Sequence, residues 1–116
     1  KPDEVDFICA HGTATLYNDE MEAKAVHLMK MGGVPINSLK GYFGHTLGAA
    51  GVLESILSAE SLKRNELIAT AGFETTGVSE SLNVVKENTK QVLKTCLKTA
   101  SGFGGCNAAL VLQKRN

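Results

Sequence analysis

The stretch from Lys40 to Gly51 constrains the fold of this chain more than any other part of the sequence. It begins with a lysine, reaches a histidine at position 45 and ends in Gly48-Ala49-Ala50-Gly51, a run that has almost no side-chain volume. The residues that follow, 52–57, are mostly apolar and continue well as a helix. The pattern therefore predicts a loop that enters a helix whose first turn packs closely against other backbone.

His45 stands just before the predicted start of this helix. Thr46 is the expected N-cap, because its hydroxyl can accept a hydrogen bond from the free amides of the first turn. His45 then lies at the positive end of the helix dipole, which disfavours the charged imidazolium. We therefore expect His45 to be a neutral hydrogen-bond donor, a group suited to stabilising an oxyanion as it forms.

Composition and length narrow the class of protein. The 116 residues suit a single domain, residues 1–116, and the sequence starts with Lys1-Pro2 and enters a strand pattern at once, so we expect a domain of a longer chain. Twelve basic and 12 acidic residues balance, which indicates neither a nucleic-acid nor a membrane partner. Three cysteines without a C-x-x-C pair predict reduced thiols and a cytoplasmic location.

Apolar periodicity and glycine positions predict an α/β fold with the order β-α-β-α-β-β. The first helix is expected to be capped by Asn18 or Asp19 and to end near Lys30, and the second to run from about Leu47 to Lys63. The second helix carries few charges and is expected to be a buried central helix. A short edge strand is expected near 67–69, and a segment that pairs locally near 82–85. The main expected strands are 5–10, 34–38, 91–100 and, after a glycine turn at 101–107, a buried strand at 108–113.

Two of the predicted strands are followed directly by polar residues. His11 ends the first strand, and Lys40 and His45 follow the second. Open α/β sheets bind their ligands at such strand ends, so we expect these three residues to meet at one rim.

Each candidate residue also has a purely structural interpretation. His11 can cap its loop, Lys40 can be solvated, and Glu22 can form a capping box with Asp19. Thr13 and Thr15 can satisfy loop backbone groups, and Phe103 can be a core residue or a gate between glycine hinges. A zinc set from the histidines and cysteines matches no close-paired ligand pattern, so no metal site is predicted.

Three segments taken together favour a functional interpretation. In order and interval they resemble the β-ketoacyl-acyl-carrier-protein synthases over essentially the whole chain, and they imply the carboxyl-terminal, thiolase-like half of that fold. They are His11-Gly12-Thr13-Ala14-Thr15 with Asn18, Asp19 and Glu22, then Lys40-x-x-x-Gly44-His45-x-Leu47-Gly48-Ala49-Ala50-Gly51, and then Gly102-Phe103-Gly104-Gly105-x-Asn107.

The resemblance implies a decarboxylative Claisen condensation in fatty acid or polyketide synthesis. A cysteine in the amino-terminal half accepts an acyl group, and a malonyl thioester on an acyl carrier protein loses carbon dioxide and attacks it as an enolate. By resemblance, His11 and His45 are catalytic residues that donate hydrogen bonds to the thioester oxygen. Lys40 organises the site electrostatically, and Glu22 is the acidic residue paired with it.

The same resemblance implies how substrate and partners are bound. Thr13 and Thr15 hold the phosphopantetheine arm, and Phe103 gates the acyl pocket. No cofactor is implied beyond the 4'-phosphopantetheine that carries the substrate. The implied partners are the acyl carrier protein, the amino-terminal half of the same synthase and a second copy of the full-length protein. The fragment alone is expected to be inactive, because the nucleophile lies outside it, and to expose apolar surface.

One alternative is a non-catalytic partner subunit of the chain-length-factor type, which pairs with a true synthase. Retention of His11, Lys40 and His45 favours the enzyme, because a silent subunit has no need of this set. A thiolase-type or hydroxymethylglutaryl-type relative is a third interpretation, and the two histidine motifs argue against it.

Overall fold

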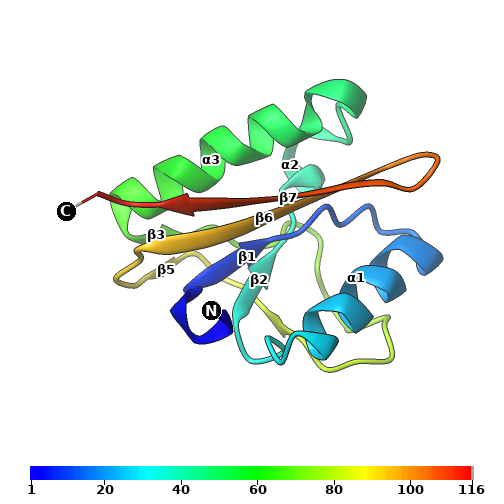
Figure 1. Cartoon of the computed structure of the whole chain (residues 1–116), viewed down its shortest axis with the longest axis horizontal. Coiled ribbons are helices and arrows are strands. Elements are labelled where there is room, and N and C mark those ends of the chain that lie inside the picture. The colour runs from blue at the N-terminus through cyan, green and yellow to red at the C-terminus, as the bar shows by residue number, and fades with distance from the viewer. Residues whose placement is uncertain (116) are drawn as a thin grey trace.

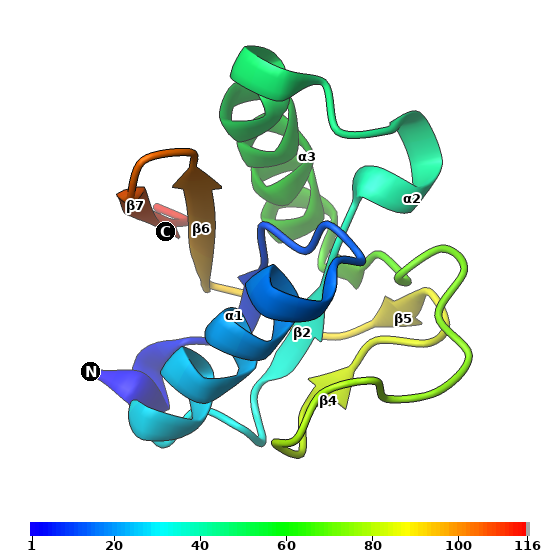
Figure 2. The same ribbon diagram turned by 90° about the vertical axis from the view of Figure 1, so that its right-hand side faces the viewer.

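The computed structural model describes residues 1–115 and contains a mixed five-stranded sheet with the strand order β4-β2-β1-β6-β7. Helix α1 lies on one face of this sheet and α3 on the other (Figures 1 and 2). The strands of the sheet are β1 (Phe7–Cys9), β2 (Pro35–Asn37), β4 (Asn83–Val84), β6 (Thr95–Gly102) and β7 (Cys106–Gln113). The helices are α1 (Leu16–Leu28), α2 (Lys40–Phe43) and α3 (Ala50–Arg64), with 3-10 turns η1 (Pro2–Glu4) and η2 (Leu47–Ala49).

Strand β1 is the centre of the sheet because its side chains are apolar on both faces. Phe7, Ile8 and Cys9 are each at most 1% exposed, as expected for a strand between two parallel neighbours. Successive side chains point to opposite faces, so Phe7 and Cys9 pack with Leu62 of α3, whereas Ile8 packs with Ile36 on the α1 side. The sheet therefore has a separate apolar cluster under each helix.

The pairing of the strands confirms the predicted mixed α/β fold with a terminal hairpin. β1 is parallel to β2 and to β6, and β7 is antiparallel to β6. Gly104 and Gly105 form the tight turn of that hairpin with φ of +83° and +82°, which glycine adopts without steric cost. The segment at 82–85 does not pair locally, because β4 joins the sheet edge parallel to β2. The expected edge strand near 67–69 is β3 (Glu66–Leu67), which pairs with β5 (Thr89–Lys90) outside the main sheet.

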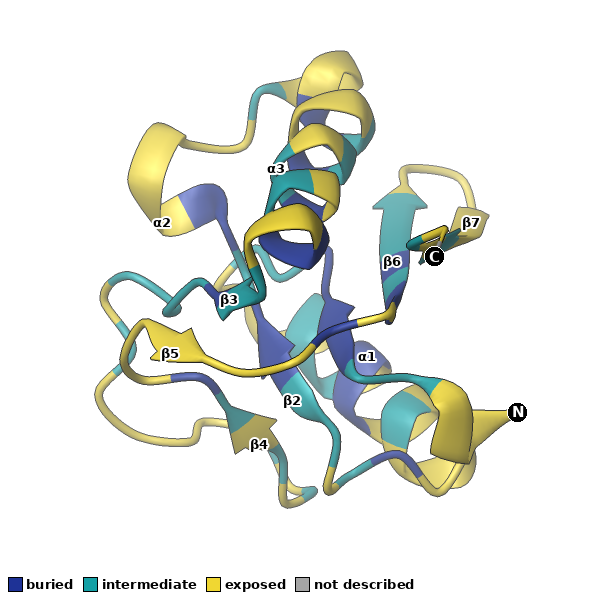
Figure 3. Ribbon diagram, turned by 90° about the vertical axis from the view of Figure 1, so that its left-hand side faces the viewer, coloured by how far each residue is buried: buried dark blue, intermediate teal, exposed yellow. Residues whose placement is uncertain are grey.

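Burial of the second helix and the last strand differs from the prediction. Helix α3 buries one face only, while Val52, Leu53 and Ile56 on its other face are 64%, 40% and 56% exposed. Strand β7, expected to be buried, is an exposed edge in which Val111 is 60% exposed (Figure 3). Within residues 1–115 no second layer covers these surfaces, so the expected exposed apolar surface is present.

Two element boundaries were also placed wrongly from the sequence. Helix α1 begins at Leu16 with Thr15 as its N-cap, not at Asn18 or Asp19. Strand β6 begins at Thr95, because the preceding segment leaves the sheet and Val92 is 73% exposed. None of the helices in residues 1–115 is both long enough and apolar enough to span a membrane.

Candidate active site

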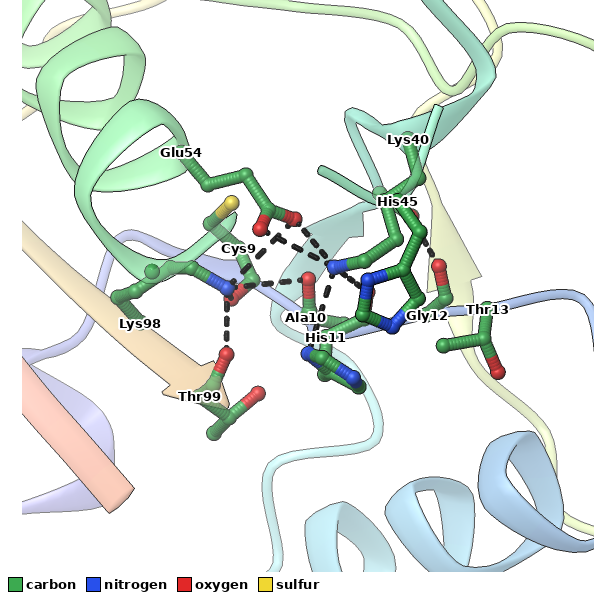
Figure 4. A network of polar contacts seen from close by, with 12 residues as sticks. Cys9, Ala10, His11, Gly12, Thr13, Lys40, His45, Glu54, Lys98 and Thr99 are labelled. Carbon is green, nitrogen blue, oxygen red and sulfur yellow. Dashed lines mark hydrogen bonds and ion pairs between the residues drawn. The ribbon is translucent and has the colours of Figure 1, made fainter. Parts of the chain in front are cut away.

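The candidate site lies where β1 and β2 end. His11 follows β1, and Lys40 opens α2 shortly after β2. Because β1 and β2 are adjacent and parallel, their carboxyl ends meet at the same edge of the sheet. His11, Lys40 and His45 lie close together there (Figure 4). His45 comes from the segment after α2 and lies against His11. The structure thus confirms that these three residues share one rim.

The two histidine rings are in edge-to-face contact, with centroids 5.1 Å apart and planes inclined by 78°. His45 Nδ1 accepts a hydrogen bond from the Leu47 amide at 3.2 Å. His11 Nδ1 lies 3.3 Å from Lys40 Nζ. An amide and an ammonium only donate, so both Nδ1 atoms are acceptors and both rings carry their proton on Nε2. The pair is therefore two neutral imidazoles, each with an Nε2–H donor.

The neutral state of His45 has a different cause from the one expected. Thr46 does not cap a helix through its hydroxyl: it has φ of +55°, and its Oγ1 is buried without a hydrogen-bond partner among the described residues. The turn η2 separates Thr46 from α3, which begins at Ala50. The contact between the Leu47 amide and His45 Nδ1, rather than a capped helix end, fixes the tautomer.

His11 is only 5% exposed, and burial lowers the pKa of its imidazole below the ordinary histidine value. The neighbouring Lys40 ammonium lowers this pKa further, whereas the carboxylate of Glu22 acts in the opposite direction. Because burial and the lysine dominate, His11 is neutral at neutral pH.

Lys40 is held by Glu54, not by Glu22. Its Nζ donates to the Glu54 carboxylate oxygens at 2.8 and 3.1 Å and to the His11 carbonyl at 2.6 Å. Glu54 is fully buried in α3, and a buried cation needs such a partner. The expected Lys40–Glu22 pair is therefore wrong, and sequence reasoning missed Glu54. The available signal was a lone carboxylate within the apolar first half of the α3 sequence.

Glu22 instead fixes the loop that carries His11. Its carboxylate accepts hydrogen bonds from the backbone amides of His11 (2.9 Å) and Gly12 (2.7 Å) and from the Thr99 hydroxyl (2.9 Å). The capping box with Asp19 is absent from α1, because Asp19 accepts from the Thr13 amide at 3.1 Å. Glu22 positions the site through the backbone and does not contact Lys40.

Gly12 permits the close approach of this loop to β2. Its φ is +42°, and a Cβ at this position would lie 2.6 Å from the Cβ and Oγ of Ser38. The Ser38 hydroxyl donates to the Gly12 carbonyl at 2.8 Å, which ties the two strand ends together. Only glycine fits this conformation and this space without displacing the residue next to His11.

An open cleft of about 770 Å³ lies beside His45, and the neighbours of His11 in the chain, Ala10 and Gly12, also line it. Thr13, Thr15, Lys40 and His45 line it together with the segment 70–78. The hydroxyls of Thr13 and Thr15 are hydrogen-bonded to each other at 2.7 Å. The structure does not bring Phe103 to this cleft: the side chain is fully exposed at the β6–β7 turn.

The cysteines of the described chain lie outside this cleft. Burial raises the pKa of the Cys9 thiol and raises that of Cys96 to about 12, so both remain protonated thiols at neutral pH. Cys106 is exposed at the start of β7. In residues 1–115 no group of three or more His, Cys, Asp or Glu side chains is placed to hold a metal ion.

Comparison with known proteins assigns a family to this site. The family profile described as β-ketoacyl synthase, C-terminal domain, matches residues 1–74, which include His11, Lys40, His45 and Glu54. The chain belongs to this family. The fold described above is thus that of a β-ketoacyl synthase carboxyl-terminal domain, and the rim of two histidines and a buried lysine lies within the matched residues.

Individual relatives agree with this assignment over nearly the whole chain. The chain is 34% identical to the 3-oxoacyl-acyl-carrier-protein synthase 2 of Coxiella burnetii, over 97% of its own length and 28% of that protein. It is 36% identical to synthase 1 of Escherichia coli (95% and 28%) and 32% identical to the polyketide malonyl-ACP decarboxylase PksF of Bacillus subtilis (97% and 27%). The chain therefore spans less than a third of the length of these relatives.

Solved structures extend the likeness to the arrangement of the elements. The ishigamide ketosynthase/chain length factor superposes with a TM-score of 0.95 at 28% identity, over 100% of this chain and 29% of that one. A type II polyketide ketosynthase in complex with its acyl-carrier protein superposes with a TM-score of 0.91 at 32% identity, over 97% and 29%.

Proposed function

We propose that this domain is the carboxyl-terminal half of a β-ketoacyl-acyl-carrier-protein synthase. The parent protein is an acyltransferase that condenses malonyl-acyl-carrier protein with an acyl thioester and releases carbon dioxide. The observation that carries the proposal is the pair of neutral Nε2–H donors on His11 and His45, whose rings are in contact with each other at the edge of an open cleft that His45 lines.

The chemistry follows from what these two donors do to a thioester. When the carbon–carbon bond to the malonyl carboxylate breaks, its electron pair moves onto the thioester carbonyl and an enolate oxygen forms as carbon dioxide leaves. Two fixed N–H donors stabilise that oxygen more than they stabilise the starting carbonyl, which accelerates the step. No proton is transferred, so neutral imidazoles suffice. Lys40 holds His11 in place, because its ammonium donates to both the carbonyl oxygen and Nδ1 of that residue.

The remaining parts of the site belong to the same proposal. The hydroxyls of Thr13 and Thr15 at the cleft fit a polar arm such as phosphopantetheine. Phe103 is the proposed gate of the acyl pocket, and it lies on a hairpin with two glycines in its turn. The cysteine nucleophile comes from an amino-terminal half that packs on the exposed face of α3. An acyl carrier protein as substrate partner, a homodimer of the parent protein and a cytoplasmic location complete the proposal.

The test is release of carbon dioxide from malonyl-acyl-carrier protein by the parent protein. We expect His11→Ala and His45→Ala each to lower the rate by about 100-fold or more, because each removes one donor to the enolate oxygen. His27→Ala is the matched control, because His27 is an exposed histidine of α1 that pairs with Glu80 and is expected to leave the rate unchanged. Rates within twofold of the wild type for both site variants would refute the proposal.

The alternative is a partner subunit of the chain-length-factor type, since three of the similar structures are named as ketosynthases with chain length factors. Such a subunit would release no carbon dioxide by itself and would restore condensation only when a separate synthase is added. The same assay, run with and without a second synthase, therefore distinguishes the two functions.

A further inference from the structure

A second lysine lies on the other side of Glu54. Lys98 of β6 is 2% exposed, and its Nζ is 3.8 Å from Glu54 Oε1 (Figure 4). The same nitrogen donates to the carbonyls of Cys9 (3.4 Å), Ala10 (3.3 Å) and Thr99. Each of these neighbours is a hydrogen-bond acceptor, so the side chain is an ammonium with three N–H donors in use.

These contacts connect Lys98 to the loop that carries His11. The carbonyls of Cys9 and Ala10 belong to the last residues before His11, at the point where the chain leaves the sheet. Thr99, the third partner, also donates through its hydroxyl to Glu22, which holds the His11 amide. Lys98 therefore joins the end of β1 to β6 directly beneath the histidine.

The charges around Glu54 do not balance. Two buried ammonium groups, Lys40 and Lys98, face this single buried carboxylate. The carboxylate of Glu22 is engaged by backbone amides and the Thr99 hydroxyl, and it reaches neither lysine. Burying a charge costs free energy, and Lys40 alone would neutralise the Glu54 carboxylate. Stability of the fold therefore does not explain why a second lysine is buried here.

We propose that Lys98 is a positioning residue of the decarboxylation site, whose ammonium keeps His11 in its neutral, Nε2-protonated form and offsets the second of the two carboxylates, Glu22 and Glu54, that surround the site. The inference rests on the proposed function. With Lys98 the two lysines balance the two carboxylates, and without it the site would carry a net negative charge. Such a charge would disfavour the developing enolate, because the negative charge of that oxygen appears in a region that excludes much of the water.

All the charged and titratable groups that face His11 bear on this inference. They are Glu22 from α1, Lys40 from α2, His45 from the segment that follows α2, and Lys98 from β6, with Glu54 of α3 behind the lysines. The two lysines lower the pKa of His11, and Glu22 raises it. Without Lys98, Lys40 and Glu54 offset each other and the carboxylate of Glu22 is left without a compensating charge, so the pKa of His11 rises. Protonation then places a proton on Nδ1 and breaks the contact with Lys40 Nζ.

The experiment compares four variants of the parent protein. Lys98→Met removes the charge and the donors, Lys98→Gln removes the charge and keeps a donor, and Lys98→Arg keeps both. Lys94→Met is the control, because Lys94 is exposed just before β6. The His11 ring is titrated by NMR on protein labelled at the histidine ring carbons, with the signal assigned through His11→Gln. The pH profile of carbon dioxide release from malonyl-acyl-carrier protein is measured in parallel.

We expect Lys98→Met and Lys98→Gln to raise the midpoint of the His11 titration by about half a unit or more. The acidic limb of the pH profile of kcat/KM should move to higher pH by the same amount. On this limb kcat/KM should therefore fall about threefold at a given pH, and the loss should become smaller toward pH 8. Lys98→Arg and Lys94→Met should titrate like the wild type. If the methionine variant does not fold, the glutamine variant decides.

An unchanged His11 titration in folded Lys98→Gln would overturn the inference, whatever happens to the rate. A uniform loss of kcat at every pH without a shift of the titration would overturn it too, because that is the result of a merely structural lysine. The NMR titration does not depend on activity. A wild-type protein that releases no carbon dioxide would therefore refute the proposed function and still leave the role of Lys98 to be decided.

Discussion

Replacement of Glu54 by alanine is the most informative single perturbation of this domain. Glu54 is fully buried, and it is the carboxylate that both Lys40 and Lys98 face. Their side chains are only 7% and 2% exposed, so neither ammonium can reach water without moving the backbone to which it is bonded. The alanine variant would leave two buried cations close to each other with no counter-charge.

The expected cost follows from this arrangement. Removing one partner of a buried ion pair typically costs about 3–5 kcal/mol, because the charge that remains is desolvated and unpaired. Two cations lose their partner here, so we expect Glu54→Ala to fall at the upper end, about 4–5 kcal/mol. Such a loss is a large part of the stability of a domain of this size, commonly about 5–15 kcal/mol. Glu54→Gln should lose most of the same free energy although it preserves the side-chain volume.

The assay is equilibrium urea unfolding of the 116-residue chain, followed by far-ultraviolet circular dichroism at low protein concentration. Glu60→Gln is the control, because Glu60 lies on the same helix in exposed pairs with Lys63 and Arg64 and should show no measurable change. The reasoning is refuted if Glu54→Ala unfolds within about 1 kcal/mol of the wild type, the range of an exposed ion pair.

Two further predictions concern the backbone and the exposed face. Gly12→Ala should destabilise the domain by about 1–3 kcal/mol and slow carbon dioxide release by the parent protein, since the new Cβ meets Ser38 at 2.6 Å on a backbone with φ of +42°. Gly48→Ala, where a Cβ meets nothing within 4 Å, is its control, and equal effects of the two in urea unfolding would contradict the steric explanation. Ile56→Glu should change the stability of the chain by no more than about 0.5 kcal/mol, because Ile56 is 56% exposed. The same variant should weaken self-association in sedimentation velocity, and unchanged sedimentation would show that this face of α3 is not the one that associates.

Local sequence patterns predicted the order of the main elements correctly. The continuous apolar run of β1 and the glycines of the hairpin turn reflect local backbone preferences, so they can be interpreted without knowledge of the fold. The close packing expected from the small residues before α3 is wrong at Gly48 and Gly51, where a Cβ would meet nothing within 4 Å. The same patterns predicted the burial of two elements wrongly. Helix α3 and strand β7 are apolar enough to be buried, yet Ile56 and Val111 are exposed, because apolarity does not show whether a covering layer is present in residues 1–115.

The sequence by itself determined which residues meet at the rim, because His11, Lys40 and His45 follow two strands whose ends must coincide once they pair in parallel. It did not determine their partners. Glu54 lies 14 residues beyond Lys40 in another helix, and Lys98 lies at the far end of the chain, in the strand that pairs with β1. The contacts among Lys40, Glu54 and Lys98 exist only because packing α3 and β6 against β1 buries these charges in one small volume, where each must find a counter-charge or an acceptor. Tertiary structure alone decided that Glu54 faces both lysines and that Glu22 holds the loop.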